Sequence, residues 1–330
     1  MADVLEKCGV CGAMLDEEDL FCGNCGTEAP DRNREPSQGS FQATHNFECD
    51  SCGASMSYDA SAQNLRCPFC GSEKLEARQE TRMLAPQRVL PFGIGRGDAE
   101  RIMRQWLGRG FFRPGDLAMR AAIDCITPVY VPFWVFSART TTHWTADSSV
   151  VPPGARASWY PVFGTSAGEY RDLLIGGSGV LTMQETTEIC PFELGRAVAP
   201  EEVDLTNAVY EQFRVHRKYA RPLAQRGLED LERKACQRFV PGQCRNMKVN
   251  VLLDGLASEP VLLPVWIMAY RYQDRVYRFL VNGSSGKATG TAPNDWKKMV
   301  LVGAAVVLGI LLLLFLFAAC AGLLGMTASP

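Results

Sequence analysis

The longest apolar run of the chain lies near its C-terminal end. Residues 300–324 read VLVGAAVVLGILLLLFLFAACAGLL and contain no charged side chain. A helix of this length extends for about 37 Å, which is enough to cross a hydrocarbon core of about 30 Å with some tilt. The run lacks the polar stripe expected of a helix that packs on one side only. We therefore expect one transmembrane helix over residues 299–324, in contact with the lipid bilayer.

Strand and helix patterns alternate in the middle of the chain. Runs of β-branched and aromatic residues bounded by turn signals predict strands over residues 133–145, 265–272 and 275–281, the last two forming a hairpin. Apolar residues at helical spacing predict helices over residues 98–107 and 223–239, the second entered at Pro222 and stopped by Pro241. Together they predict an α+β domain over residues 83–293.

Two segments of this domain resemble each other. Residues 128–134 (PVYVPFW) and 260–266 (PVLLPVW) share both prolines, the valine and the tryptophan at the same spacing. Each follows a helical stretch, and each has a Pro-Phe dipeptide further upstream, at residues 91–92 and 191–192. We infer an internal duplication of one helix-then-strand unit.

The first 71 residues contain the motif Cys-x-x-Cys-Gly four times. Two thiolates at this spacing can grip one tetrahedral metal ion, and the glycine permits the left-handed turn that follows. Pairing consecutive motifs gives two sites, Cys8, Cys11, Cys22 and Cys25 in the first and Cys49, Cys52, Cys67 and Cys70 in the second. We expect two zinc ribbons with rubredoxin-like knuckles, over residues 1–28 and 47–74, separated by a flexible polar linker over residues 29–46.

Other uses of these cysteines fit less well. A disulfide framework requires an oxidising compartment, and residues 1–7 have no apolar signal segment. A thioredoxin-like redox pair requires a strand-to-helix context, which these polar segments lack. Iron has the same ligand set, so zinc and iron both remain open, with zinc preferred. Because four thiolates leave no ligand position for a substrate, we expect each of the two ions to be structural.

Charge is distributed unevenly along the chain. The net charge is −2, but residues 1–80 carry 6 Lys/Arg against 15 Asp/Glu, whereas residues 81–330 carry 28 against 21. Acidic ribbons suit a phosphate backbone poorly, which makes nucleic acid an unlikely partner.

A basic segment extends from residue 214 to residue 248, with ten Lys/Arg and three acidic residues. Its candidate anion-contacting residues are Arg214, Arg217, Lys218, Arg221, Arg226, Arg233, Lys234 and Arg238. Three interpretations remain: a solvated helix face, contact with anionic lipid head groups, or docking of the acidic ribbons.

No catalytic motif is present. Residues 282–287 (NGSSGK) have the wrong glycine spacing for a phosphate-binding loop and predict a turn instead. The histidines, His45, His143 and His216, share no helical spacing, and the remaining cysteines are expected to be isolated thiols: Cys125, Cys190, Cys236, Cys244 and Cys320. We expect no enzymatic activity.

Lys297 and Lys298 directly precede the apolar run, and residues 325–330 carry no charge. The positive-inside rule then predicts a single-pass protein of the cell inner membrane, with its bulk in the cytoplasm and a short tail outside. Small residues in the run, including Gly303, Ala304 and Gly309, would permit helix self-association, or they are ordinary membrane filler. The oligomeric state stays open.

Residues 262–266 (LLPVW), 270–272 (YRY), 277–283 (YRFLVNG) and the following Gly286-Lys287 resemble a bacterial group of zinc-ribbon membrane proteins. Members are identified as transcription-factor-IIB-type zinc-ribbon proteins or as relatives of the primosomal helicase. Some relatives are associated with envelope stress, and the resemblance implies a membrane adaptor. This chain has no helicase motor motif, so we do not expect that activity.

The leading hypothesis is a membrane-anchored zinc-ribbon adaptor, or scaffold, that mediates cytosolic protein–protein interactions at the inner membrane. One alternative is a nucleic-acid-binding zinc-ribbon protein of replication or transcription. Another is an enzyme with a site in the α+β domain.

Overall fold

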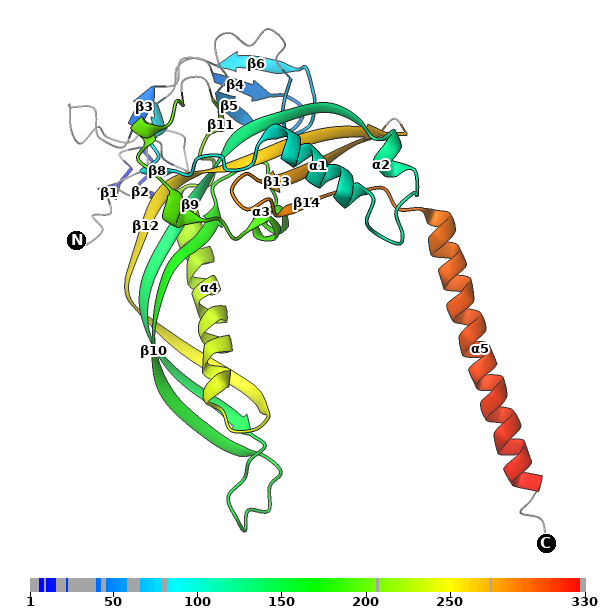
Figure 1. Cartoon of the computed structure of the whole chain (residues 1–330). Coiled ribbons are helices and arrows are strands. Elements are labelled where there is room, and N and C mark those ends of the chain that lie inside the picture. The colour runs from blue at the N-terminus through cyan, green and yellow to red at the C-terminus, as the bar shows by residue number, and fades with distance from the viewer. Residues whose placement is uncertain are drawn as a thin grey trace.

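The computed structural model describes residues 6–8, 10–15, 22, 40–42, 46–57, 66–78, 82–205, 208–273 and 275–326. It confirms a mixed α+β fold with an apolar C-terminal helix (Figure 1). The helices are α1 (Arg96–Leu107), α2 (Leu117–Arg120), α3 (Met183–Ile189), α4 (Arg217–Cys236) and α5 (Trp296–Met326), with 3-10 turns at Leu194–Arg196, Pro200–Glu202 and Gln237–Phe239.

The strands are short near the N-terminus and very long in the middle of the chain. They are β1 (Glu6–Lys7), β2 (Met14–Leu15), β3 (Ser40–Gln42), β4 (Asn46–Cys49), β5 (Ser55–Ser57), β6 (Leu75–Arg78), β7 (Arg82–Leu84), β8 (Arg88–Val89), β9 (Ala122–Ser148), β10 (Tyr160–Gly176), β11 (Val209–Glu211), β12 (Cys244–Tyr272), β13 (Arg275–Asn282) and β14 (Ala288–Gly290).

One mixed, ten-stranded sheet holds most of these strands. Its order is β14-β13-β12-β9-β11-β5-β4-β6, with β10 on β9 and β8 on β12. β11 runs parallel to β9, and β8 runs parallel to β12. The pairs β1–β2 and β3–β7 form two small separate sheets. The predicted hairpin is confirmed, because β12 and β13 pair from Val265–Asn282 to Tyr272–Arg275.

Strands β9, β10 and β12 continue beyond the rest of the sheet as a curved three-stranded arm (Figure 1), which comprises residues 135–176 and 244–259. Helix α4 packs along one face of the arm. Its buried positions recur every fourth residue, which places them on one side of the helix: Ala220, Ala224, Leu228, Glu232 and Cys236. Three of these side chains are small, so the helix can approach the strands closely.

Both predicted helices exist, with shifted boundaries. α1 begins at Arg96, with Asp98 in its first turn, and ends at Leu107 as expected. α4 begins at Arg217, so Pro222 lies inside the helix rather than at its start. Proline removes one backbone hydrogen bond. The burial of Ala220 and Ala224 against Trp134 and Phe136 offsets that loss.

The two PVxxPxW segments lie side by side in the middle of the sheet. Pro128 is opposite Trp266, and Trp134 is opposite Pro260, in the antiparallel pair β9–β12. Trp266 makes an edge-to-face contact with Phe92 at 5.3 Å, and Trp134 makes the same contact with Phe213 at 5.3 Å. Phe192, of the second Pro-Phe dipeptide, contacts Phe133 instead.

Residues 282–287 form the predicted turn. The Gly286 amide donates to the Asn282 carbonyl at 2.9 Å. The buried Asn282 side chain accepts from the amides of Ser284 and Ser285 and donates to the Ile189 carbonyl. Asn282 thus fixes the end of β13 against α3, and the segment has a structural role.

Candidate metal centre

Two tight knuckles, residues 49–53 and 67–71, carry the second cysteine group. In each knuckle the glycine amide donates to the carbonyl of the first cysteine at 2.8 Å, from Gly53 to Cys49 and from Gly71 to Cys67. The φ angles of Gly53 and Gly71 are +73° and +74°, the left-handed conformation that their position after each Cys pair predicts.

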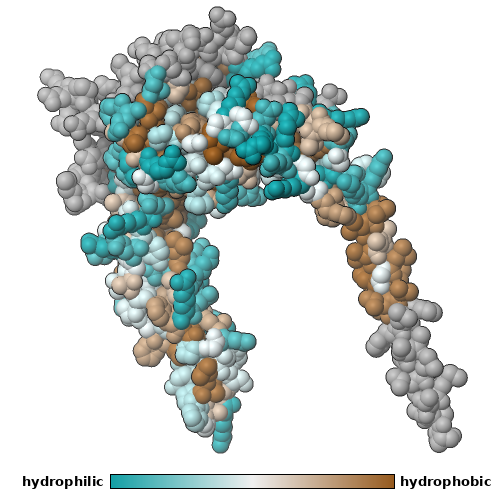
Figure 2. All heavy atoms as spheres, in the orientation of Figure 1, coloured by the Kyte–Doolittle hydropathy of each residue, from teal (hydrophilic) through white to brown (hydrophobic). Residues whose placement is uncertain are grey.

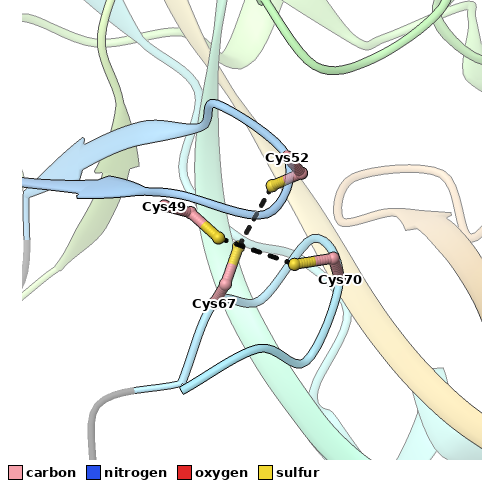
Figure 3. Close-up of side chains that lie close together, drawn as sticks. All are labelled: Cys49, Cys52, Cys67 and Cys70. Carbon is pink, nitrogen blue, oxygen red and sulfur yellow. Dashed lines mark hydrogen bonds between the residues drawn. The ribbon is translucent and has the colours of Figure 1, made fainter. Parts of the chain in front are cut away.

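The four thiol groups converge on a common centre (Figure 3). All four Sγ atoms lie within 4.8 Å of one another, with 3.6 Å between Cys49 and Cys70 and 3.5 Å between Cys52 and Cys67. Sulfur atoms about 2.3 Å from a tetrahedral ion stand about 3.8 Å from one another. Cys49, Cys52, Cys67 and Cys70 could therefore hold a metal ion with little rearrangement.

As free thiols, Cys52, Cys67 and Cys70 have different pKa values. The hydrogen bond from Cys67 lowers the pKa of Cys52 to about 5, and the same bond, with burial, raises the pKa of Cys67. Burial raises the pKa of Cys70 to about 11. Cys52 is thus more acidic than Cys67, its hydrogen-bond partner. A bound cation would remove the remaining protons, because its charge stabilises every thiolate that coordinates it.

The first cysteine group has the same local geometry in its described half. The Gly12 amide donates to the Cys8 carbonyl at 2.9 Å, and Gly12 has a φ of +70°. Cys8, Cys11 and Cys22 lie within 4.8 Å of one another, and the Sγ atoms of Cys11 and Cys22 are 3.4 Å apart. Cys25, the fourth predicted ligand, lies outside the described residues. The three described cysteines could hold a metal ion.

The two groups differ in what surrounds them. Cys49 and Cys67 are fully buried in the main hydrophobic core, together with Phe69, Val131 and Leu263. Cys8 and Cys22 belong to a small separate cluster with Leu15. Among the described residues, the second cysteine group is therefore part of the core of the α+β fold, whereas the first belongs to a separate cluster.

Strand β11 connects the second centre to the long strands. It pairs antiparallel with β5, through Tyr210–Ser57, and parallel with β9, through Tyr210–Tyr130. The segment predicted as the second ribbon therefore shares one sheet with the segment predicted as the α+β domain.

Glu211, at the end of β11, is a buried acid beside this centre that sequence reasoning missed. Its Oε1 accepts hydrogen bonds from the Ser178 hydroxyl at 2.8 Å and the Gly179 amide at 3.0 Å. Its Oε2 is buried without a hydrogen-bond partner among the described residues. Burial raises the pKa of Glu211 to about 7. A single glutamate between Tyr210 and Gln212 carries no motif that could have identified it.

The basic residues of segment 214–248 have different surroundings. Arg214 forms an ion pair with Glu48 at 3.1 Å and donates to Ser55, so it fastens the second ribbon segment to the α4 side. Arg221 donates to the Leu256 carbonyl at 3.4 Å, and Lys218 lies over the Tyr219 ring. Arg233 pairs with Asp230, Arg217 lines a hollow of the arm, and Arg226, Lys234 and Arg238 are exposed. Contact of this segment with lipid stays a prediction.

The remaining predicted thiols and histidines lie apart from these centres. Cys190 donates to the Thr186 carbonyl at 3.1 Å, and Cys236 is buried beside Ser166. His143 contacts Thr165 on the arm, and His216 precedes α4. His45 and the side chains of Cys125 and Cys320 lie outside the described residues, whereas Cys244 is half-buried.

A hollow of about 560 Å³ on the arm includes two carboxylates, Glu169 and Asp254, in its lining. Arg171 pairs with Glu169 at 2.7 Å and holds its pKa below the usual value, which makes it a weak base. Arg139 lies 3.9 Å from Asp254. The hollow is therefore better described as an ion-paired surface depression.

Helix α5 is long and apolar enough to cross a membrane. Its described span Trp296–Leu314 has a mean hydropathy of 2.3, and none of that window is buried within the fold. Figure 2 shows it as an apolar column that projects away from the mostly hydrophilic body.

Comparison with known proteins gives one relative and no fold assignment. The chain is 23% identical to the uncharacterized protein YdjG of Bacillus subtilis (strain 168), in an alignment of 305 residues that covers 75% of this chain and 89% of the relative. No protein-family model matches the chain, and no solved structure matches it. These comparisons carry no functional information to this chain.

Proposed function

We propose that the chain is a membrane-anchored zinc-ribbon adaptor that holds partner proteins at the cytosolic face of the inner membrane. Helix α5 would be the anchor, with Lys297 and Lys298 on the cytosolic side and the short tail outside. A cytosolic body suits its thiolate ligands, because that compartment is reducing. The protein does no chemistry of its own in this proposal.

Zinc is the ion that best suits the two cysteine groups. It takes four thiolates in a tetrahedral site, and the sulfur spacing in the second group supports that geometry. The ions would be structural, because a site closed by four thiolates leaves no position for a substrate. The reciprocal contacts of Trp134 and Trp266 support the accompanying proposal of a duplicated unit.

The observation that carries the adaptor proposal is the outer face of the arm. Helix α4 covers the other face of the arm. The outer face carries three rows of paired residues, and each row has one residue from β10, one from β9 and one from β12. The rows are Phe163, Thr145 and Lys248; Thr165, His143 and Asn250; and Ala167, Thr141 and Leu252. Phe163 is 83% exposed and Leu252 is 51% exposed. A hollow of about 410 Å³ lies between His143, Phe163 and Lys248.

Apolar anchors within a polar surface are typical of protein–protein interfaces. The arm also offers strand edges, because β10 and the arm segment of β12 pair only with β9 among the described residues. Such edges can accept a strand from a partner.

The proposal is tested by affinity purification of tagged full-length protein from gently solubilised membranes. A variant of the arm, Phe163→Asp with Leu252→Asp, is compared with a ribbon variant, Cys8→Ser with Cys11→Ser. Met183→Asp, at a residue of α3 that is 65% exposed, is the matched control. Proteins and nucleic acids in each eluate are identified.

A defined protein set that is lost from the arm or ribbon variant and retained in the control supports the adaptor. The same protein set in all four eluates contradicts it. Nuclease-sensitive nucleic acid that disappears with the ribbon variant would instead favour the nucleic-acid alternative, against the charge of the ribbons.

A further inference from the structure

The loop between α1 and α2 exposes two adjacent aromatic side chains. Residues 108–116 read GRGFFRPGD, and Phe111 and Phe112 are 72% and 42% exposed. Their rings meet edge to face at 5.3 Å, so they form one apolar projection. Met119, at 83% exposed, extends the apolar surface into α2.

This loop is joined to the first turn of α5. The Asp295 amide donates to the Phe112 carbonyl at 2.7 Å, and Lys298 Nζ donates to the Arg113 carbonyl at 2.7 Å. Figure 1 shows the loop beside the start of α5. Trp296 and Met299 in that turn are themselves 67% and 50% exposed. The exposed aromatic residues of the loop therefore lie beside the start of the candidate membrane span.

The loop is also fixed on the side of the body. The Arg113 guanidinium lies 3.6 Å from the centre of the Trp106 ring and donates to the Trp106 carbonyl. The contacts of Arg113 with Trp106 thus hold the loop that carries the exposed aromatic residues.

The charge around this surface is positive. Residues 108–120 and 295–299 contain five basic residues, Arg109, Arg113, Arg120, Lys297 and Lys298, against Asp116 and Asp295. Asp116 pairs with Arg120 at 3.3 Å and accepts a hydrogen bond from the Tyr272 hydroxyl. A positive rim around aromatic side chains is complementary to anionic head groups above an apolar bilayer interior.

We propose that loop 108–116 is a second membrane contact, which inserts Phe111 and Phe112 into the interface of the same anionic bilayer that α5 crosses. This inference rests on the proposed membrane anchoring. The first turn of α5 lies at the head groups, and its hydrogen bonds to the loop bring the aromatic rings to the same depth. Two contacts fix the orientation of the body relative to the membrane, which a single helix does not.

The full chain is reconstituted in lipid nanodiscs with a photo-crosslinking residue, Phe111→p-benzoylphenylalanine. The control is Val10→p-benzoylphenylalanine, at a residue that is 71% exposed in the first cysteine group. Lipid adducts are counted by mass spectrometry in phosphatidylcholine alone and in a mixture with phosphatidylglycerol. We expect about fivefold more adducts at position 111 than at position 10, with a further rise in the anionic mixture.

Equal adduct yields at positions 111 and 10, in protein that still resists carbonate extraction from membranes, would overturn the loop contact and leave the α5 anchor standing. Protein that carbonate extracts would contradict the anchor itself. The variant Arg109→Gln with Arg120→Gln is expected to remove the rise in the anionic mixture. Persistence of that rise would overturn the assignment of an anionic surface.

Discussion

Trp134 and Trp266, which lie in neighbouring strands, make equivalent hydrogen bonds to the segments that precede two different helices. The indole of Trp134 donates to the Val215 carbonyl at 2.8 Å, just before α4, and that of Trp266 donates to the Ile94 carbonyl at 2.8 Å, just before α1. The backbone amide of Val215 donates to the Gly177 carbonyl, and the backbone amide of Ile94 donates to the Gly283 carbonyl. Trp134 thus holds the chain that leads into α4, and Trp266 holds the chain that leads into α1.

We therefore expect Trp134→Phe and Trp266→Phe to destabilise the protein by similar amounts, about 1–3 kcal/mol each, because each leaves a carbonyl without its donor. Thermal unfolding of the full chain in detergent measures the effect. Trp159→Phe, in the loop before β10, is the control and should change the melting temperature little. A neutral result at Trp134 or Trp266 alone would contradict the equivalence of the two halves.

The two cysteine groups should differ in their effect on folding. Cys67→Ser with Cys70→Ser, and Cys8→Ser with Cys11→Ser, are each expected to lower the zinc content from about two ions to about one per chain. Only the first pair should unfold the body, because a structural site contributes on the order of 10 kcal/mol, comparable with total stability. Elemental analysis and near-ultraviolet circular dichroism check both outcomes. An intact body in the Cys67/Cys70 variant would show that the second centre is dispensable to the core.

Glu211 should make stability fall as pH rises towards neutrality. Its pKa increases from 4.5 to about 7 on folding, so the folded chain binds more protons than the unfolded chain between these values. The free energy of unfolding then falls as pH rises through that window and is level above it. Glu211→Gln removes this term. We expect the variant to gain stability relative to the parent as pH rises from 6 to about 8.

The measurement for Glu211→Gln is the melting temperature of both proteins between pH 6 and 9 with saturating zinc, a range that avoids acid release of the metal. Glu48→Gln, at a partly exposed acid of the neighbouring second ribbon segment, is the control. A constant difference between variant and parent across the range would show that Glu211 does not titrate there.

Gly168 on the arm leaves no room for a side chain. A Cβ atom there would lie 2.4 Å from Glu232 Oε1 and 2.7 Å from Thr140 Oγ1, which are hydrogen-bonded to each other beneath α4. Gly168→Ala should therefore lower stability by about 1–3 kcal/mol. Ala167→Ser, at the exposed neighbouring position, should have little effect. Equal unfolding midpoints in denaturant for the two variants would contradict this packing.

Local patterns predicted local structure well. Gly12, Gly53 and Gly71, each after a cysteine pair, predicted the left-handed knuckles, and the uncharged run predicted α5, because both depend on neighbouring residues. The hairpin at Gln273 followed from strand composition on both sides of one turn. The sulfur grouping of Cys49, Cys52, Cys67 and Cys70 was predicted by spacing alone.

Long-range relationships were not predictable in the same way. Strand β11 has three residues and no periodicity, yet it joins the second metal centre to β9. Phe213 contacts Trp134 as Phe92 contacts Trp266, and the positions of the two Pro-Phe dipeptides did not indicate that contact. The end of β9 is polar and rich in threonine, so its sequence did not indicate an arm. The apolar cover of its inner face comes from α4, which lies far along the chain.

The arm and α5 leave the body on the same side (Figure 1), yet the surface of the arm is mostly polar and that of α5 is apolar (Figure 2). The arm exposes charges such as Arg245 and Lys248, whereas α5 exposes leucine and valine. On the proposed topology α5 crosses the hydrocarbon and the polar arm does not, so the bilayer surface would run at a slant past the arm. Transmembrane helices commonly tilt by up to about 40°, which accommodates such a slant. On that topology the arm would lie over the head groups and would limit the tilt of α5.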